Sequence, residues 1–209
     1  MDRMLLVDLN LKDFLAKTAS NSPVPGGGSI AALSGAIAAS LSEMVAHLTI
    51  GKKGYEVLEE EMQDIAKDAF RYRKRLIRTI DKDSDAYNSV MAAFKLPKGT
   101  EQEQNNRKGA IQETLKNAAL VPLDVARDAL KIIELAGKVV KKGNKNAVTD
   151  AAVAVMMART AGLSALYNVK INLVSIKDTD FVEEITEEIK HMENAIVNRE
   201  REFLSDVSI

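Results

Sequence analysis

The chain lacks cysteine altogether and has only two histidines among its 209 residues. Without cysteine, a disulfide framework, a thiol nucleophile and a zinc site built on thiolates are all excluded. The two histidines, His47 and His191, lie far apart in the sequence, which argues against a histidine-rich metal site. We therefore expect no metal centre.

An excess of either charge is also missing. Lys plus Arg number 29 and Asp plus Glu number 30, for a net charge of -1. This balance argues against a dedicated nucleic-acid-binding protein and against a protein of membrane surfaces. No basic segment followed by an apolar core and a cleavage site occurs at the N-terminus, so a cytoplasmic location is expected. The length fits a single domain, residues 1–209, with a sizeable core.

One stretch has no charge at all, over residues 23–42. Its length raises the question of a membrane span. The stretch consists largely of Gly, Ser and Ala with two prolines at one end, and it lacks the Leu, Val and Phe content that a span needs. We therefore expect no membrane segment.

Apolar residues recur at steps of three and four over nearly the whole chain, and no segment shows convincing alternation with a period of two. The pattern predicts an all-α fold, a helical bundle of about five to six helices with a long central helix. A short first helix is expected around Leu6 to Leu15, capped by Asp8 or Asn10. Further helices are expected over residues 29–50, 55–95, 100–140, 146–173 and 178–204. Pro122 is expected to kink or split its helix, because proline has no amide proton.

Two of these helices carry stripes of small residues and almost no charge. The stripes are Ala32, Gly35, Ala39, Ser42 and Ala46 in the first, and Ala147, Ala151, Ala154, Ala158, Ala161 and Ala165 in the second. Small side chains let helix backbones approach closely, so both helices should be buried in the core or in a subunit interface. We expect a homodimer with a largely helical interface and C2 symmetry.

A glycine-rich loop precedes the first of these two helices. Residues 22–29 read Ser-Pro-Val-Pro-Gly-Gly-Gly-Ser, and the loop proper comprises Pro25, Gly26, Gly27, Gly28 and Ser29. Glycines allow close approach of a ligand or another backbone, and the free amides of a helix N-terminus favour an anion. The loop is not a P-loop or a dinucleotide fingerprint, because no strand precedes it and Gly-Lys-Ser/Thr is missing.

Asp83 is the strongest candidate for a chemical role. It falls three residues after Ile80 and four before Tyr87, on the apolar face of the helix expected over 55–95. A carboxylate on an inward face has an environment that can shift its pKa and suit it to general acid–base work. The alternative is a buried structural carboxylate. Asp81 and Asp85 cannot share that face and are expected to be solvated.

Polar residues also occur on the helix expected over 146–173. Asp150, Asn168 and Asn172 lie on one stripe with alanines between them. The two amides are one turn apart and can read the edge of a heteroaromatic ring, or they can bridge helices. Asn146 or Asn144 could simply cap this helix. Lys52 could neutralise an anionic ligand tail or lie in a solvated turn.

These features occur within an ordered set of motifs. The set comprises Pro25-Gly26-Gly27-Gly28-Ser29, Leu48-Thr49-Ile50-Gly51-Lys52-Lys53, Asp81-Lys82-Asp83-Ser84-Asp85-Ala86-Tyr87, Leu96-Pro97-Lys98, Val121-Pro122-Leu123, Gly143-Asn144, Asp150 and Tyr167-Asn168-Val169-Lys170-Ile171-Asn172-Leu173. With these motifs the chain resembles the formiminotransferase-cyclodeaminase family over essentially its whole length. It resembles both the cyclodeaminase domain of the bifunctional mammalian enzyme and its stand-alone bacterial relatives.

The resemblance implies an all-helical dimer with a folate site and neither metal nor redox cofactor. It implies that the catalytic carboxylate is Asp83, or else Asp81, and that the glycine loop lines the folate pocket. Substrate contacts are then expected from the loop and from Lys52, Asn144, Asp150, Asn168 and Asn172. The implied reaction is formiminotetrahydrofolate cyclodeaminase, which converts 5-formiminotetrahydrofolate to 5,10-methenyltetrahydrofolate and ammonia.

Two other functions remain open at this point. One is methenyltetrahydrofolate cyclohydrolase, in which water attacks the methenyl carbon and opens the ring. The other is a non-catalytic helical module that binds folate. The sequence also leaves open whether the pocket lies within one subunit or across the dimer, the preferred polyglutamate length, and any assembly beyond the dimer.

Overall fold

The chain folds as a bundle of long helices. The structure is a computed structural model, and it describes residues 4–207. Its elements are η1 (Leu6–Asp8), α1 (Leu11–Thr18), α2 (Gly27–His47), η2 (Glu56–Leu58), α3 (Glu59–Phe94), α4 (Glu101–Lys142), η3 (Lys145–Ala147), α5 (Val148–Leu173) and α6 (Thr179–Ser205). No strand occurs within residues 4–207. The predicted all-α fold is confirmed.

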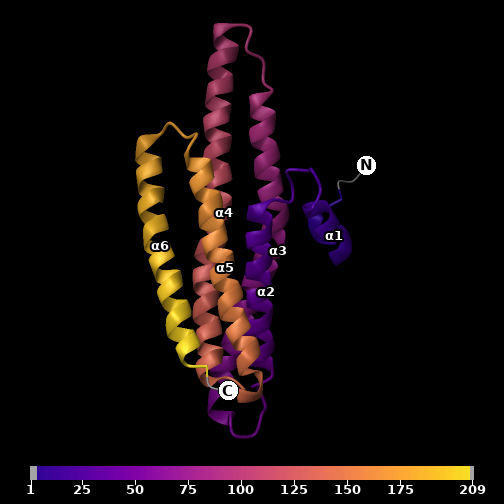
Figure 1. Cartoon of the computed structure of the whole chain (residues 1–209), viewed down its shortest axis with the longest axis vertical. Helices are drawn as coiled ribbons and strands as arrows, with labels where there is room; N and C mark the ends of the chain where they lie inside the picture. The colour runs from indigo at the N-terminus through magenta and orange to yellow at the C-terminus, as the bar shows by residue number, and fades with distance from the viewer. Residues whose placement is uncertain (1–3, 208–209) are drawn as a thin grey trace.

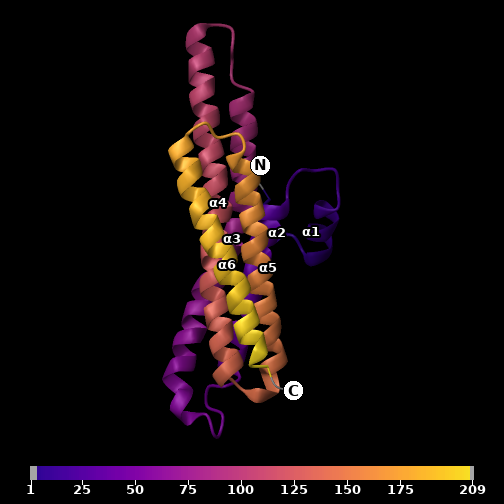
Figure 2. The same cartoon turned by 60° about the vertical axis from the view of Figure 1, so that its left-hand side comes forward.

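The five long helices run along one common axis (Figure 1). α2 packs against α3, α4 and α5, and α6 covers α4 and α5. The hairpin formed by α3 and α4 extends past the other helices at one end of the bundle, and α1 stands clear of it beside α2 (Figures 1 and 2). The longest helix is α4, with 42 residues, and α3 has 36.

Polar caps set several of the helix ends. Asn10, one of the two candidates from the sequence, caps α1 by accepting from the amide of Asp13. Thr100 and Glu103 form a capping box at the start of α4. Asp178 caps α6. The glycine loop begins α2 without any side-chain cap, two residues earlier than expected.

Pro122 neither splits α4 nor ends it, because the helix continues from Glu101 to Lys142. Proline cannot donate to the carbonyl of Ala118, one turn earlier. The side chain of Asn172 on α5 donates to that carbonyl instead, at 3.0 Å. The tertiary bond therefore replaces the missing helical one. Of the two expectations for Pro122, the split was wrong, and the kink stays a prediction.

The core contains many small residues, and glycines let large side chains enter at the helix contacts. A Cβ at Gly35 would approach Leu76, one at Gly137 would approach the ring of Phe203, and one at Gly162 would approach Ile196. The alanine stripes of α2 and α5 are buried. Interlocking of small and large residues therefore lets the helices pack closely.

By length and composition alone, α2 and the segment Lys145–Leu173 could each cross a membrane. In the bundle, however, 61% and 50% of their apolar windows are buried inside the protein. This burial is typical of core helices.

Gly137→Ala tests the packing at α6. The new methyl group would lie within 2.5 Å of the Phe203 ring, so we expect a loss of about 1–3 kcal/mol in the free energy of unfolding. Gly109→Ala is the matched control, because Gly109 is in the same helix and has nothing within 4 Å of a new Cβ. The control should gain up to about 1 kcal/mol from helix propensity alone. If urea denaturation showed an equal gain in unfolding free energy for both variants, the packing argument would be contradicted.

Asn172→Ala tests the bond to the Ala118 carbonyl. Loss of the donor leaves a carbonyl without a partner and should cost about 1–3 kcal/mol of unfolding free energy. In a Pro122→Ala background, residue 122 regains an amide that can satisfy the same carbonyl. The cost of Asn172→Ala should therefore shrink there, as measured in a double-mutant cycle. The same cost in both backgrounds would show that the bond is not what Asn172 contributes.

Candidate active site

A cleft opens where α2 begins. Gly27 starts α2 beside Asp83 of α3 and Asn168 of α5, while α3 continues for about three further turns to Phe94. The space above the first turn of α2 is a cavity of about 330 Å³. Its lining comprises Pro23, Val24, Gly26, Gly27, Gly28, Asp83, Ala86, Tyr87, Val90, Ala118, Asn168, Ile171 and Asn172.

The glycine loop contacts the two polar side chains that the sequence singled out. A Cβ at Gly28 would overlap the Asp83 carboxylate, and one at Gly27 would lie 3.0 Å from the Asn168 amide nitrogen. Any larger residue at position 28 would displace the carboxylate. The glycines are therefore needed for the approach of α2 to α3 and α5.

Asp83 is held by Ser29, in the first turn of α2. The Ser29 hydroxyl lies 3.0 Å from Asp83 Oδ2, 3.0 Å from the Ile80 carbonyl and 3.4 Å from the Ser84 hydroxyl. Ser29 is fully buried, so this small network fixes the carboxylate at the floor of the cleft. The predicted inward position of Asp83 agrees with this placement.

Burial raises the pKa of the Asp83 carboxyl above its ordinary value, because the charged form is poorly solvated there. Hydrogen bonds from the Ser29 side chain and backbone act in the opposite direction, and burial is the larger effect. A carboxyl group with a raised pKa can both accept and donate a proton closer to neutral pH.

Two amides form the opposite wall. The Asn168 side chain donates to the Ser164 carbonyl at 2.8 Å, and that of Asn172 donates to the carbonyls of Ala118 and Asn168. Neither Oδ1 atom has a hydrogen-bond partner among residues 4–207. The wall therefore offers two acceptors to a ligand with N–H donors.

The expectation that Asp81 is solvated was wrong. Asp81 is only 7% exposed, and its carboxylate accepts from the backbone amides of Leu6 at 2.7 Å and Val7 at 3.3 Å. It does not line the cleft, and it fastens η1 to α3. Asp85 is exposed, as expected.

Three other candidates lie at the far end of the bundle. Asn144 donates from its backbone to Thr49 and from its side chain to the Leu48 carbonyl, and it caps η3. Lys52 follows the end of α2, and Asp150 is in the first turn of α5. The length of α2, 21 residues, places this group about 30 Å from the cleft in the same subunit.

The apolar part of the cleft was not identified from the sequence. Tyr87, Val90 and Ile171 line it. Tyr87 was assigned to the apolar face of a helix, and such a position is equally consistent with the core. One signal in the sequence could have indicated that α4 and α5 meet here. Pro122 leaves a carbonyl of α4 without its helical donor, and the side-chain amides at the end of α5 can supply one.

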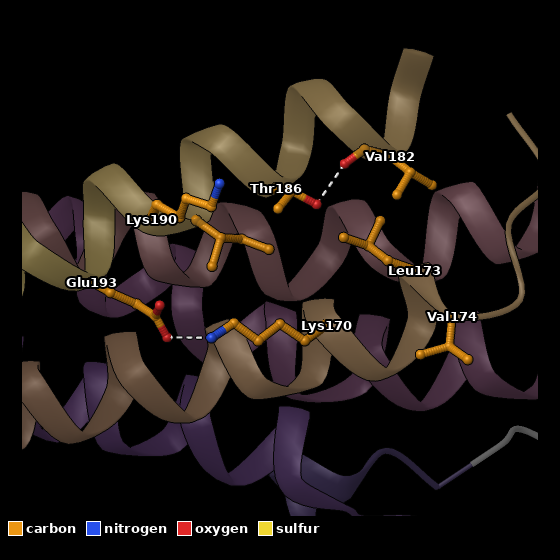
Figure 3. Close-up of a pocket in the computed structure, with 8 residues that line it drawn as sticks. Lys170, Leu173, Val174, Val182, Thr186, Lys190 and Glu193 are labelled. Carbon is orange, nitrogen blue, oxygen red and sulfur yellow. Dashed lines mark hydrogen bonds and ion pairs between the residues drawn. The ribbon is translucent and has the colours of Figure 1, made fainter. Parts of the chain in front are cut away.

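A second cavity of about 360 Å³ lies between α5 and α6 (Figure 3). Its walls are mainly aliphatic, and its rim holds an ion pair between Lys170 and Glu193 at 2.6 Å. The Thr186 hydroxyl is bound to the Val182 carbonyl of its own helix. The carboxylate in this lining, Glu193, is already paired with Lys170, whereas Asp83 faces its cleft with only neutral hydrogen-bond partners, so the cleft at Asp83 is the better candidate for chemistry.

Comparison with known proteins shows similarity to one family over most of the chain. Residues 10–191 match the formiminotransferase-cyclodeaminase family. A methenyltetrahydrofolate cyclohydrolase of Methylorubrum extorquens is 41% identical over 86% of this chain and 86% of its own. The formimidoyltransferase-cyclodeaminase of Rattus norvegicus is 31% identical over 90% of this chain, which spans only 35% of that relative. The crystal structure of a formiminotetrahydrofolate cyclodeaminase from Thermotoga maritima superposes with a TM-score of 0.87, at 34% identity over 96% of both chains.

Asp83→Asn tests the burial of the carboxylate without any substrate. Because the folded-state pKa is raised, the stability that this group contributes is complete below the unfolded pKa of about 4 and is lost as pH rises through the folded pKa. The neutral amide avoids that loss. We therefore expect Asp83→Asn to unfold at higher urea than the parent at pH 7.5, with the difference narrowing toward pH 4.

Asp64→Asn, at an exposed position of the same helix, is the control and should show no such pH-dependent gain. A loss of stability at neutral pH in Asp83→Asn would show that the ionised carboxylate is stabilising, against the burial argument.

Proposed function

We propose that this chain, which belongs to the formiminotransferase-cyclodeaminase family, is a folate enzyme that acts on a one-carbon unit bridging N5 and N10 of tetrahydrofolate. The observation that carries the proposal is the partly buried Asp83, held against Gly28 and Ser29 at the floor of a cleft with free amide acceptors. The pterin ring system has N–H donors along one edge, which suit the Oδ1 atoms of Asn168 and Asn172.

The first candidate reaction is hydrolysis of 5,10-methenyltetrahydrofolate. Of the relatives compared above, the cyclohydrolase has the highest identity and matches this chain over most of both lengths. Water adds to the amidinium carbon while Asp83 takes a proton from it. The resulting tetrahedral carbon bears the hydroxyl group and both nitrogens. Asp83 then returns its proton to N5 as the C–N5 bond breaks, and one proton is released to solvent overall.

The second candidate is the cyclodeaminase reaction, which the sequence favoured and for which the Thermotoga maritima relative is named. The formimino group reacts in its protonated, cationic form: N10 attacks its carbon and gives up its proton to Asp83, and the former imine nitrogen becomes an amine. Asp83 then protonates the leaving nitrogen, and ammonia departs. Both reactions pass through a tetrahedral carbon between N5 and N10, so one carboxyl group in one place serves either.

The remaining parts of the proposal rest on the same family membership. The reaction uses no metal and no redox cofactor, because proton transfers alone complete it. The enzyme works in the cytoplasm as a homodimer, and binds neither nucleic acid nor membranes. The alternative is a folate-binding module without catalysis, and turnover of either folate in the assays below would exclude it.

The choice of reaction is tested by offering the purified protein each folate and following the methenyl chromophore. Loss of the chromophore from 5,10-methenyltetrahydrofolate identifies the cyclohydrolase, and its appearance from 5-formiminotetrahydrofolate identifies the cyclodeaminase. We expect the first. Folate binding with neither turnover would refute the enzyme and leave the binding module.

Asp83→Asn should reduce kcat by about 10²–10⁴, the usual contribution of a general acid–base group, with the fold intact by circular dichroism. Asp85→Asn is the matched control, since that aspartate is exposed on the same helix and does not line the cleft. The control should keep near-parental turnover. Near-parental turnover in Asp83→Asn as well would remove the assignment.

The pH dependence of kcat/KM gives an independent test. The base form of Asp83 is needed for the first proton transfer, so activity should fall as pH drops through its pKa. Because burial raises that pKa, the acid limb should lie above the ordinary carboxyl range. An acid limb at or below pH 4, or its persistence in Asp83→Asn, would assign the titration to another group.

A further inference from the structure

The hydroxyl of Ser29 has two acceptors and only one proton to give. Its oxygen lies 3.0 Å from the carbonyl oxygen of Ile80 and 3.0 Å from Oδ2 of Asp83. A serine hydroxyl donates one hydrogen bond at a time, so it satisfies either the carbonyl or the carboxyl group. Ser29 is fully buried, and bulk water does not compete for the proton. The choice between the two acceptors therefore depends on the charge of Asp83.

An ionised Asp83 attracts the hydroxyl proton more strongly than the carbonyl does. Hydrogen bonds to a charged acceptor are roughly twice as strong as those to a neutral one. Once Asp83 carries a proton of its own, it loses that advantage, and the peptide carbonyl of Ile80 becomes the better acceptor. Rotation about the Cβ–Oγ bond of Ser29 is enough for the change, because both acceptors already lie at hydrogen-bond distance.

The Ile80 carbonyl tolerates both orientations of the hydroxyl. It lies in the interior of α3, where helix geometry supplies the backbone amide of Ser84, four residues later, as its donor. The carbonyl therefore keeps this partner when the Ser29 hydroxyl turns to Asp83. Because the carbonyl is satisfied in both orientations, the free-energy penalty of an unpaired buried group does not oppose the rotation.

Ser84 supplies a second hydroxyl behind Ser29. It is 1% exposed, and its oxygen lies 3.4 Å from that of Ser29. A serine inside a helix commonly donates to the carbonyl four residues earlier, which for Ser84 is that of Ile80. The Ser84 hydroxyl instead has Ser29 as its one hydrogen-bond partner among residues 4–207. The Ile80 carbonyl is thereby left to Ser29, and the donors form a chain from Ser84 through Ser29 to Asp83.

The surroundings of Asp83 leave its protonation to burial and to Ser29. Among the described residues that line the cleft, Tyr87 is the one other titratable group, and α2, α4 and α5 contribute uncharged residues. Asp81 is bound by the amides of η1, and Lys82 and Asp85 are exposed. Burial raises the pKa of Asp83, and the hydrogen bonds from Ser29 lower it. The Ser29 hydroxyl is therefore the side chain that adjusts to the proton on Asp83.

We propose that Ser29 is a positioning residue whose hydroxyl follows the charge of Asp83, so that one carboxyl group acts first as base and then as acid. This inference rests on the proposed function for the two proton transfers. In the first transfer, the attacking water or N10 gives a proton to Asp83, which becomes neutral, and the hydroxyl turns to the Ile80 carbonyl.

The second transfer reverses these changes. Asp83 gives its proton to N5 or to the leaving nitrogen, becomes an anion again and regains the hydrogen bond from Ser29. Ser29 keeps its own proton throughout, and only the direction of that proton changes. The site therefore returns to its starting state without any movement of a helix or of the carboxyl group.

Titration of Asp83 tests the proposal without any substrate. Its carboxyl carbon is followed by NMR in protein made with 13C-labelled aspartate, and the signal is identified by its absence from Asp83→Asn. In Ser29→Ala the anion loses its donor, so the pKa of Asp83 should rise by about 1–2 pH units. Ser42→Ala is the matched control, because it removes another fully buried hydroxyl of α2, which donates to the Ala38 carbonyl of its own helix. The control should leave the titration unchanged.

Ser84→Ala tests whether the second hydroxyl acts through the first. Alone, it should raise the pKa of Asp83 by less than Ser29→Ala does, because Ser84 is hydrogen-bonded to Ser29 and not to the carboxylate. In a Ser29→Ala background it should add nothing, as measured in a double-mutant cycle. An effect of the same size in both backgrounds, zero included, would remove Ser84 from the chain of donors.

The pH profile of turnover separates this role from simple packing. Ser29→Ala should move the acid limb of kcat/KM upward by the same amount as the NMR titration. On the acid side of the limb, activity should fall about tenfold for each pH unit of the shift. Above the limb it should stay near the parental value, because Asp83 is then ionised with or without the hydroxyl. A loss of activity at every pH with an unmoved limb would leave Ser29 a merely structural role and overturn the proposal.

An unchanged or lowered pKa of Asp83 in folded Ser29→Ala would also overturn it. If Ser29→Ala does not fold, Ser84→Ala decides the question by the sign of the same shift. Failure of the proposed function itself is recognised separately, because the parental protein would then turn over neither folate. The NMR titration of Asp83 needs no turnover and still reports on the hydroxyl.

Discussion

The close approach of α2 to α3 and α5 is the contact on which the site depends. Without side chains at Gly27 and Gly28, the first turn of α2 lies directly against Asp83 and Asn168. This contact partly buries the carboxylate, which raises its pKa, and brings the Ser29 hydroxyl to it. The same approach continues along α2 through buried alanines and Gly35, so the position of the helix is set over its whole length. The proposed catalytic carboxylate and the core are therefore parts of one packing arrangement.

This arrangement has a thermodynamic consequence. A core built from small residues gains less from each buried side chain than one built from Leu and Phe, so it depends on shape complementarity. It nevertheless accommodates a poorly solvated carboxyl group at the end of α2. Groups that lower the stability of the folded protein in this way are found mostly at functional sites.

Sequence reasoning was most successful where a property repeats along a helix. The order of the helices, the small-residue faces and the inward position of Asp83 all follow from steps of three and four residues. It failed where an interaction joins distant segments. Asp81 is buried by backbone amides of Leu6 and Val7, which no periodicity reveals. Pro122 is accommodated by a side chain 54 positions away. The motifs also carry no information on which ends of the helices meet, so Lys52 and Asp150 could not be separated from the cleft by sequence alone.

The cleft exists because α2 starts lower than its neighbours end, and this has a consequence for how its size can change. It is the space that further turns of α2 would fill, at about 5.4 Å each. Replacing side chains in its walls alters the volume by a methyl group or a ring. Lengthening or shortening the segment between α1 and α2 would move the starting point of the helix and alter the volume by a whole turn. The dimensions of the ligand are thus matched by loop length, and insertions or deletions at residues 19–26 are the changes by which proteins of this architecture could come to admit larger or smaller molecules.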